Sequence, residues 1–175
     1  MKHVTVIATS LNSESKSQRL AGLFTEHLSD EGISHELVDL RELPLPFAGS
    51  DEGWDDANAA KLAESVERAS HVVIATPIYC YSANAVAKNV IELIGKKFSG
   101  KVVSFLCAAG GHNSYMSIMG LANHLMLDFR SVIVPRFVYA APSDWEEDSD
   151  TLNPAMLKRL QGLLDDMKRI QILDA

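Results

Sequence analysis

The chain has 175 residues, of which 47% are hydrophobic and 22% charged, and its formal net charge is −7. The length is that of one domain, and the composition is typical of a folded globular protein rather than a disordered one. The excess of acidic residues argues against a protein whose main task is binding nucleic acid or an anionic membrane.

Short runs rich in β-branched residues alternate with longer amphipathic stretches. In chain order this predicts strand Val4–Ala8, helix Ser17–Glu31, strand His35–Val38, helix Ala57–Ala69, strand Val72–Thr76, helix Ala83–Ile94, strand Val102–Cys107, helix Tyr115–Leu127, strand Val132–Tyr139 and helix Pro154–Ile170. The acidic segments Pro44–Asn58 and Pro142–Asn153 are expected to be solvated loops.

The alternation of strands and helices indicates an α/β fold of repeated βαβ units. Strands Val72–Thr76 and Val102–Cys107 are almost continuously apolar, as central strands covered on both faces are. The more polar strand His35–Val38 suits an edge. We therefore expect residues 1–175 to form one domain, a three-layer α/β/α sandwich with a doubly wound five-strand parallel sheet. The order 2-1-3-4-5 is common for such sheets.

A doubly wound sheet places its ligands in the loops after the first, third and fourth predicted strands. The first of these loops, Thr9–Gln18, carries four serines, an asparagine and a lysine at the start of a helix. Hydroxyls and free N–H groups at a helix N-terminus suit a phosphate monoester, although a simple helix cap would use the same residue types. The loop lacks the GxxxxGK[ST] and GxGxxG patterns.

The other two loops add aromatic surface and bare backbone. In Thr76–Asn84, Tyr79 and Tyr81 flank Cys80, so their rings would pack on a flat heterocycle or simply on the protein surface. In Ala108–Ser114, paired glycines either allow a ligand to approach the backbone or form a plain tight turn. Together, the three loops suit a phosphorylated flat heterocycle.

The two cysteines, Cys80 and Cys107, lie among apolar residues and form no Cys-x-x-Cys pair. We therefore expect no disulfide framework and no metal site, but two semi-buried thiols in a reducing compartment. The apolar stretch near the N-terminus is too short for a signal peptide, and no run approaches the ~18 apolar residues of a membrane span. These features predict a cytoplasmic protein.

With these loops the sequence resembles the NADPH-dependent FMN reductase family of the flavodoxin-like fold, which includes quinone, azo-dye and chromate reductases. The resemblance runs roughly from Val4 to Val138, and its motifs are the serine loop Ser10–Ser17, Thr76-Pro77-Ile78-Tyr79, Val86-Ala87-Lys88-Asn89 and Ala109-Gly110-Gly111. Two positions depart from the family pattern. Thr9 stands where the family often has glycine, and Asn12 where it often has arginine. Lys16 or Arg19 would have to replace that guanidinium beside a phosphate.

The resemblance implies an NAD(P)H-dependent FMN reductase, in which hydride passes from the nicotinamide to flavin N5. Electrons then pass to a second, small-molecule acceptor such as a quinone, an azo compound or free flavin. FMN is the implied cofactor, NADPH or NADH is the co-substrate, and no catalytic side chain is required. The implied FMN-binding residues are Ser10, Asn12, Ser15, Ser17, Gln18, Pro77, Ile78, Tyr79, Cys80, Gly110 and Gly111. Tyr81 and His112 are further candidates for ring or substrate contact.

The resemblance also implies a homodimer or homotetramer in which the partner subunit helps to wall the flavin site. Helix Ala83–Ile94 and the loop Pro44–Asn58, with Phe47 and Trp54, are the candidate contacts. Packing of these aromatic residues on their own domain is the alternative.

Three other functions remain open from the sequence. A flavodoxin-type electron carrier, which binds FMN without oxidising NAD(P)H, would suit the acidic balance and the hydroxyl-rich loop. A flavin-free hydrolase has neither a GxSxG nor an HExxH motif here, although a triad assembled from distant residues fits any single sequence. An interaction module with a decayed site would explain the missing arginine.

Overall fold

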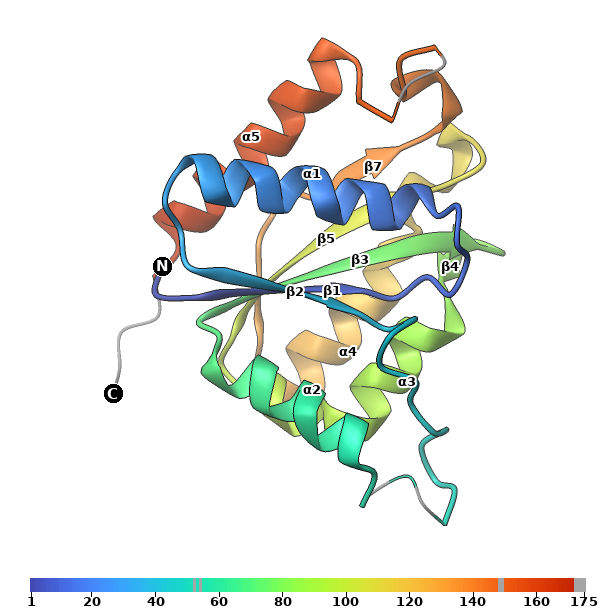
Figure 1. The fold of residues 1–175 in the computed structure, drawn as a ribbon, viewed down its shortest axis with the longest axis vertical. Coiled ribbons are helices and arrows are strands. Elements are labelled where there is room, and N and C mark those ends of the chain that lie inside the picture. The colour runs from blue at the N-terminus through green and yellow to red at the C-terminus, as the bar shows by residue number, and fades with distance from the viewer. Residues whose placement is uncertain (52, 54, 148–149, 172–175) are drawn as a thin grey trace.

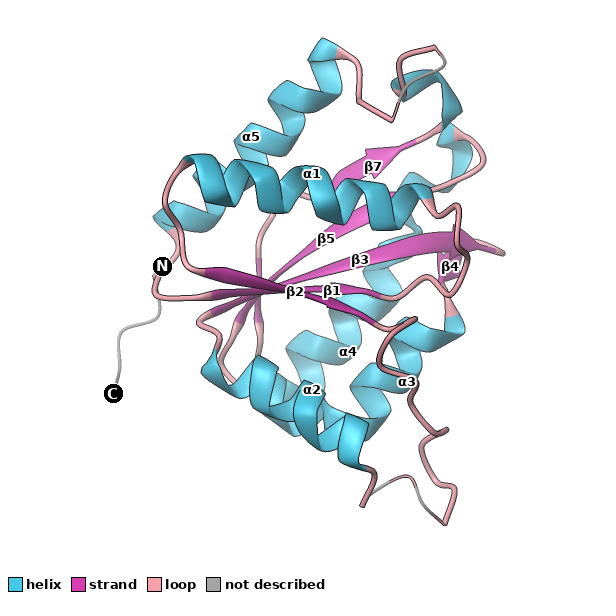
Figure 2. Ribbon diagram, in the orientation of Figure 1, coloured by secondary structure: helices cyan, strands magenta, loops and turns pink. Residues whose placement is uncertain are grey.

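Strands and helices alternate along the chain in a computed structural model, which describes residues 1–51, 53, 55–147 and 150–171 (Figures 1 and 2). The strands are β1 (Val4–Ala8), β2 (His35–Asp39), β3 (His71–Tyr79), β4 (Ser82–Ala83), β5 (Val102–Ala108), β6 (Val132–Ile133) and β7 (Val138–Ala140). The α-helices are α1 (Lys16–Asp30), α2 (Ala57–Arg68), α3 (Ala85–Ile94), α4 (Met119–Phe129) and α5 (Pro154–Arg169). Short 3₁₀ helices span Gly95–Phe98, His112–Ile118 and Pro142–Asp144.

Most predicted boundaries agree with the structure to within one or two residues, and three predictions were wrong. Strand β3 runs on past Thr76 and turns back into β4, so the second loop is a hairpin. The helix expected from Tyr115 begins instead as a 3₁₀ helix with a kink at Ser114. The expected last strand is divided into β6 and β7, which flank Pro135, a residue that cannot donate a ladder hydrogen bond.

The strands form one twisted sheet in the order β2-β1-β3-β5-β6. Strand β7 also pairs in parallel with β5, beyond the end of β6, and β4 pairs antiparallel with β3. Because β6 and β7 together replace the predicted fifth strand, the order is the expected 2-1-3-4-5, and the α/β sandwich is confirmed. In register, Val4 of β1 lies beside His71 of β3, which lies beside Val102 of β5.

Helices cover both faces of the sheet, with α1 and α5 on one face and α2, α3 and α4 on the other (Figure 1). The first face buries Phe24 and Leu160 against strand side chains, and the second buries Leu62 and Phe105. Within the described ranges, no helix is both long and apolar enough to cross a membrane. This layering places the loops that follow β1, β3 and β5 together at one edge, on the right in Figure 1.

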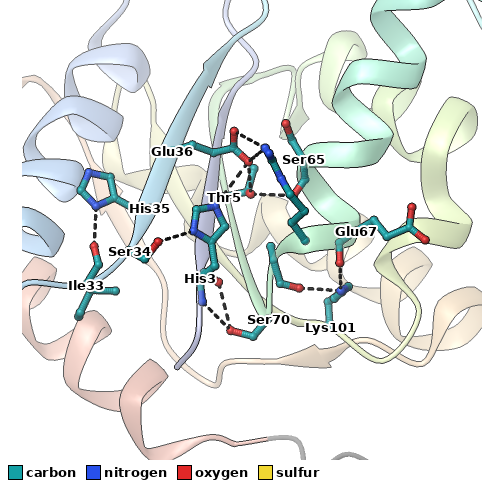
Figure 3. A network of polar contacts seen from close by, with 12 residues as sticks. His3, Thr5, Ile33, Ser34, His35, Glu36, Ser65, Glu67, Ser70 and Lys101 are labelled. Atoms are coloured by element: carbon teal, nitrogen blue, oxygen red, sulfur yellow. Dashed lines mark hydrogen bonds and ion pairs between the residues drawn. The ribbon is translucent and has the colours of Figure 1, made fainter.

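At the opposite edge of the sheet, a network of polar contacts connects strands to helix α2 (Figure 3). The Thr5 hydroxyl donates to the Glu36 carboxylate over 3.0 Å, and Arg68 donates to both Glu36 oxygens over 3.0 Å. Burial alone would raise the pKa of Glu36, but these hydrogen bonds hold it below its ordinary value. Lys101 donates to the Glu67 carbonyl over 2.8 Å. The network joins β1, β2, α2 and the start of β5, far from the edge where the three loops meet.

His71, at the start of β3, ties the end of α5 to the sheet. Its Nε2 lies 3.2 Å from the Met167 carbonyl and 3.0 Å from the Ile170 carbonyl, so this nitrogen carries the proton. Nδ1 lies 3.0 Å from the Ser70 hydroxyl. Burial lowers the pKa of His71 below its ordinary value of 6.5, although the two carbonyls oppose the shift.

We therefore expect His71 to make the fold less stable in mild acid. Because its pKa is lower in the folded state, the unfolded chain binds the proton more readily. Its stabilising contribution is complete above pH 6.5 and is lost as the pH falls from there through the folded-state pKa. Urea unfolding at pH 7.5 and 5.0 measures this loss. His71→Gln, which retains a donor for the carbonyls, should lose less stability than the wild type over that interval. Equal losses would contradict the assignment.

Candidate functional site

A hollow of about 190 Å³ opens where β1, β3 and β5 end. Its lining residues come from all three loops singled out in the sequence; they are Ser10, Asn12, Glu14, Ser15, Lys16, Ser17, Pro77, Ile78, Tyr79, Ala108, Ala109 and Gly110. A larger hollow of about 690 Å³ shares Lys16, Ala108 and Ala109 and extends under Trp145. The site is thus a continuous depression across the carboxyl ends of the central strands.

The serine loop presents hydroxyls and backbone N–H groups at the start of α1. Ser15 is the N-cap, and its Oγ accepts from the Gln18 N–H over 3.2 Å. The Ser17 hydroxyl lies 2.9 Å from that of Ser15. The first N–H groups of a helix have no partner within it, so those of Lys16 and Ser17 are available to an anion. This geometry suits a phosphate.

Asn12 shapes the loop where the resembled family often carries arginine. Its Oδ1 accepts from the Glu14 N–H over 3.0 Å, and its own N–H donates to the Ser10 hydroxyl over 3.3 Å. The Gln18 side chain turns away from the hollow and donates to Asp39 over 3.1 Å. Gln18 is therefore a predicted site residue that the structure does not place in the lining.

Three cations surround the loop, and each is held by another group. Lys16 lies 3.5 Å from the Asp150 carboxylate and 4.6 Å from the centre of the Trp145 ring. Arg19 donates to the Asp150 carbonyl over 2.8 Å. Arg41 pairs with Asp39 and also donates to the Ser13 carbonyl over 3.3 Å. The acidic segment Pro142–Asn153, expected to be only a solvated loop, therefore packs against the start of α1.

The second loop is a tight hairpin between β3 and β4. Cys80 and Tyr81 form its two-residue turn, with φ of 50° and 60°, respectively. This conformation favours glycine or asparagine, and side chains such as these cost about 1 kcal/mol or more each. Tyr79 lines the hollow, with 57% of its surface exposed. Cys80 and Tyr81 do not line it.

Gly110 and Gly111 leave the backbone of the third loop uncovered. Neither glycine has a positive φ, so the turn does not require glycine at either position. A Cβ added at either one would meet no atom within 4 Å. The absence of side chains here provides open space above the backbone. Gly110 lines the hollow, whereas Gly111 lies just outside its lining.

Tyr139 holds this loop in place, a role that the sequence analysis did not assign to it. Its hydroxyl donates to the Gly111 carbonyl over 2.6 Å and lies 2.7 Å from the Ser114 hydroxyl. His112 Nε2 lies 3.2 Å from the Ser143 hydroxyl, outside the hollow. Tyr139 lies in an apolar run of the sequence, which is typical of a core residue and gives no sign of its contact with the loop.

The expectation of two semi-buried thiols was wrong. Both cysteines are free, but Cys80 is exposed at the hairpin turn and Cys107 is fully buried in β5. Burial raises the pKa of the Cys107 thiol, which keeps it protonated and unreactive. In the part of the chain that the structure describes, no group of three or more His, Cys, Asp or Glu side chains is placed to hold a metal ion.

Comparison with known proteins identifies similar sequences and folds. A family model described as NADPH-dependent FMN reductase matches residues 2–146. An NAD(P)H-dependent FAD/FMN reductase of Geobacillus thermodenitrificans is 27% identical over 133 residues, covering 75% of this chain and 72% of the relative. An FMN-dependent NADPH-azoreductase of Staphylococcus aureus is 28% identical over 154 residues, covering 83% of this chain and 80% of the relative. The solved apo structure of an NADH:FMN oxidoreductase superposes with a TM-score of 0.82 at 16% identity. The match covers 99% of this chain and 92% of the solved one.

Proposed function

The chain belongs to the NADPH-dependent FMN reductase family, and from this premise we propose that the hollow between its three loops is the FMN site. The protein is an NAD(P)H-dependent oxidoreductase with FMN as its cofactor and a small molecule as its electron acceptor. Family membership also favours a reductase over an electron carrier, a hydrolase or a decayed module.

One observation carries the proposal: the three loops, far apart in sequence, line the same hollow. The residues fit the chemistry of the cofactor from end to end. Ser15, Ser17 and the free N–H groups of the α1 start suit a phosphate, and the open backbone at Gly110 leaves room for a flat ring. Pro77, Ile78 and Tyr79 lie between these two ends and would flank the ring system.

When bound, FMN would supply the redox chemistry, taking hydride from a nicotinamide and passing electrons to the acceptor. The chain's own residues would bind and orient it. In this proposal Ser10, Ser15 and Ser17 position the phosphate, with Asn12 holding the loop in shape. Tyr79, half exposed in the lining of the hollow, would flank the ring and leave room for nicotinamide and acceptor in turn. No acid or base from the protein is assigned to hydride transfer.

Fluorescence titration with FMN and with riboflavin tests the proposed site. The two flavins share the ring and differ in the phosphate, so a phosphate-binding loop should favour FMN by at least about tenfold, as charge-assisted hydrogen bonds do. Equal dissociation constants would contradict a phosphate site at the start of α1. The ring contacts alone would then account for flavin binding.

We further propose that residues 1–175 act as one FMN-binding domain in the cytoplasm and assemble as a homodimer or homotetramer. The continuous sheet supports one domain, and the exposed free thiol of Cys80 favours a reducing compartment.

The expected contact helix α3 exposes little apolar surface, whereas α4 exposes Met119, Met126 and Leu127. Phe47 is also exposed; Trp54 lies outside the described residues.

We expect Leu127→Glu to weaken this assembly. Leu127 is 77% exposed, so its replacement should not unfold the monomer, but a carboxylate buried in a subunit contact is costly. Sedimentation velocity should show an oligomeric wild type and a smaller Leu127→Glu species. Ala155→Glu, which adds the same charge on the exposed side of α5, is the control and should sediment as the wild type. A monomeric wild type would contradict the proposal.

A further inference from the structure

A buried cluster of hydrogen bonds joins the serine loop to the hairpin loop. Asn84 Nδ2 donates to the Thr9 carbonyl over 2.8 Å, and the Thr9 hydroxyl lies 2.9 Å from Asn84 Oδ1. The Thr76 hydroxyl donates to the same Oδ1 over 3.2 Å. Thr9 and Thr76 are fully buried, and Asn84 is 6% exposed. We call these three residues the loop clamp.

The loop clamp lies directly behind the proposed flavin site. Thr9 precedes Ser10, and Thr76 precedes Pro77, and both Ser10 and Pro77 line the hollow. Each end of the clamp is therefore one residue from a residue that would touch the flavin. Because hydrogen bonds between buried groups are strengthened by low dielectric, the clamp adds to the β1–β3 backbone ladder in holding the two loops together.

The Thr9 side chain makes a further contact between the two strands. The Thr9 hydroxyl also lies 3.1 Å from the Ala75 carbonyl, so it adds a side-chain link between β1 and β3 beyond the backbone ladder. The buried polar side chains of Thr9, Thr76 and Asn84 therefore satisfy one another's hydrogen bonds.

We propose that Thr9 and Asn84 are positioning residues that hold the phosphate-binding and ring-binding halves of the FMN site at the spacing of the bound flavin. This inference rests on the proposed FMN site. A preorganised spacing lets phosphate and ring bind together, so that one end of the ligand raises the effective concentration of the other. Neither residue touches the flavin in this arrangement.

The alternative is a purely structural role, since Asn84 is also the N-cap of α3 and accepts from the Ala87 N–H over 3.0 Å. The two roles differ in what they do to the flavins. Loss of spacing should reduce the advantage of FMN over riboflavin, because only FMN binds at both ends. Loss of stability alone would lower the melting temperature and leave that advantage unchanged.

The test measures the dissociation constants of FMN and riboflavin, and the melting temperature without flavin, for wild type, Thr9→Val and Thr9→Ser. Valine keeps the branched shape of threonine and removes the hydroxyl, whereas serine keeps it. We expect Thr9→Val to weaken FMN binding by about tenfold and riboflavin binding much less, as one lost buried hydrogen bond allows. Thr9→Ser should remain close to the wild type.

Asn84→Ser provides a second variant. Serine retains a helix cap for α3 but is too short to reach Thr9, so this variant separates the clamp from the cap. We expect it to lose the FMN advantage as Thr9→Val does. If both variants favoured FMN over riboflavin as strongly as the wild type does, the clamp would be refuted and the FMN site would still stand. If the wild type itself did not favour FMN over riboflavin, both the clamp and the proposed FMN site would be refuted.

Discussion

Replacing Ser15 with aspartate is expected to weaken FMN binding by about 100-fold while leaving the fold intact. Aspartate is as good an N-cap as serine and would still accept from the Gln18 N–H. Its charge, however, would lie where the phosphate is proposed to bind. Two like charges about 4 Å apart repel by up to about 4 kcal/mol near a protein surface, so a loss of about 100-fold is a conservative expectation. Flavin fluorescence titration measures it.

Ser15→Asn is the matched control, because asparagine has the same shape as aspartate, caps helices equally well and has no charge. It should bind FMN at least tenfold more tightly than Ser15→Asp, consistent with the cost of one nearby charge. Riboflavin has no phosphate and should bind the two variants alike. If Ser15→Asp bound FMN as tightly as Ser15→Asn, the phosphate would have to lie away from the start of α1.

Filling the open space at Gly110 is expected to block the ring end of the site. A Cβ at this position meets no atom within 4 Å and Gly110 lines the hollow, so we expect a side chain here to occupy ligand space without straining the backbone. Gly110→Leu should weaken the binding of FMN and riboflavin together, by at least about tenfold, since atoms placed in a ligand's volume exclude it. Titration of both flavins distinguishes this from a phosphate effect.

Gly110→Ala controls for size at the same position, and its effect should be much smaller than that of leucine. The melting temperature without flavin should be similar for both variants, because a Cβ at this position meets no protein atom within 4 Å. Unchanged flavin affinities in Gly110→Leu would mean that the ring does not lie over this glycine.

The sequence predicts the fold well because its signals are local. The continuous apolar runs of β3 and β5 and the amphipathic period of α5 place the buried faces directly. The last strand was predicted in one piece because apolar residues lie on both sides of Pro135-Arg136, and it is divided into β6 and β7 around Pro135, which has no N–H to donate. The hairpin turn was missed because Cys80 and Tyr81 are not turn-forming residues, and their positive φ angles are imposed by the surrounding structure.

The sequence was sufficient to predict most residues that line the candidate site, but not the contacts that those residues make. Ser15 and Gly110 lie in the hollow because loops after parallel strands meet at one edge. The sequence gives no sign that Gln18 turns toward Asp39, or that Asp150 holds Lys16 and Arg19. Nor does it show that Asn84, which falls inside the predicted helix Ala83–Ile94, joins two loops. Such contacts link residues far apart in the chain and depend on the folded geometry.

The most direct test of the account is an anaerobic absorption spectrum. The protein is incubated with FMN, desalted and then mixed with NADPH, and in a parallel sample with NADH. The account predicts that flavin bands remain with the protein and bleach on addition of at least one nicotinamide. Bands that remain but do not bleach with either would indicate an electron carrier. If no flavin remained, and excess free FMN gave no NAD(P)H oxidation either, the assignment of this hollow as an FMN reductase site would be contradicted.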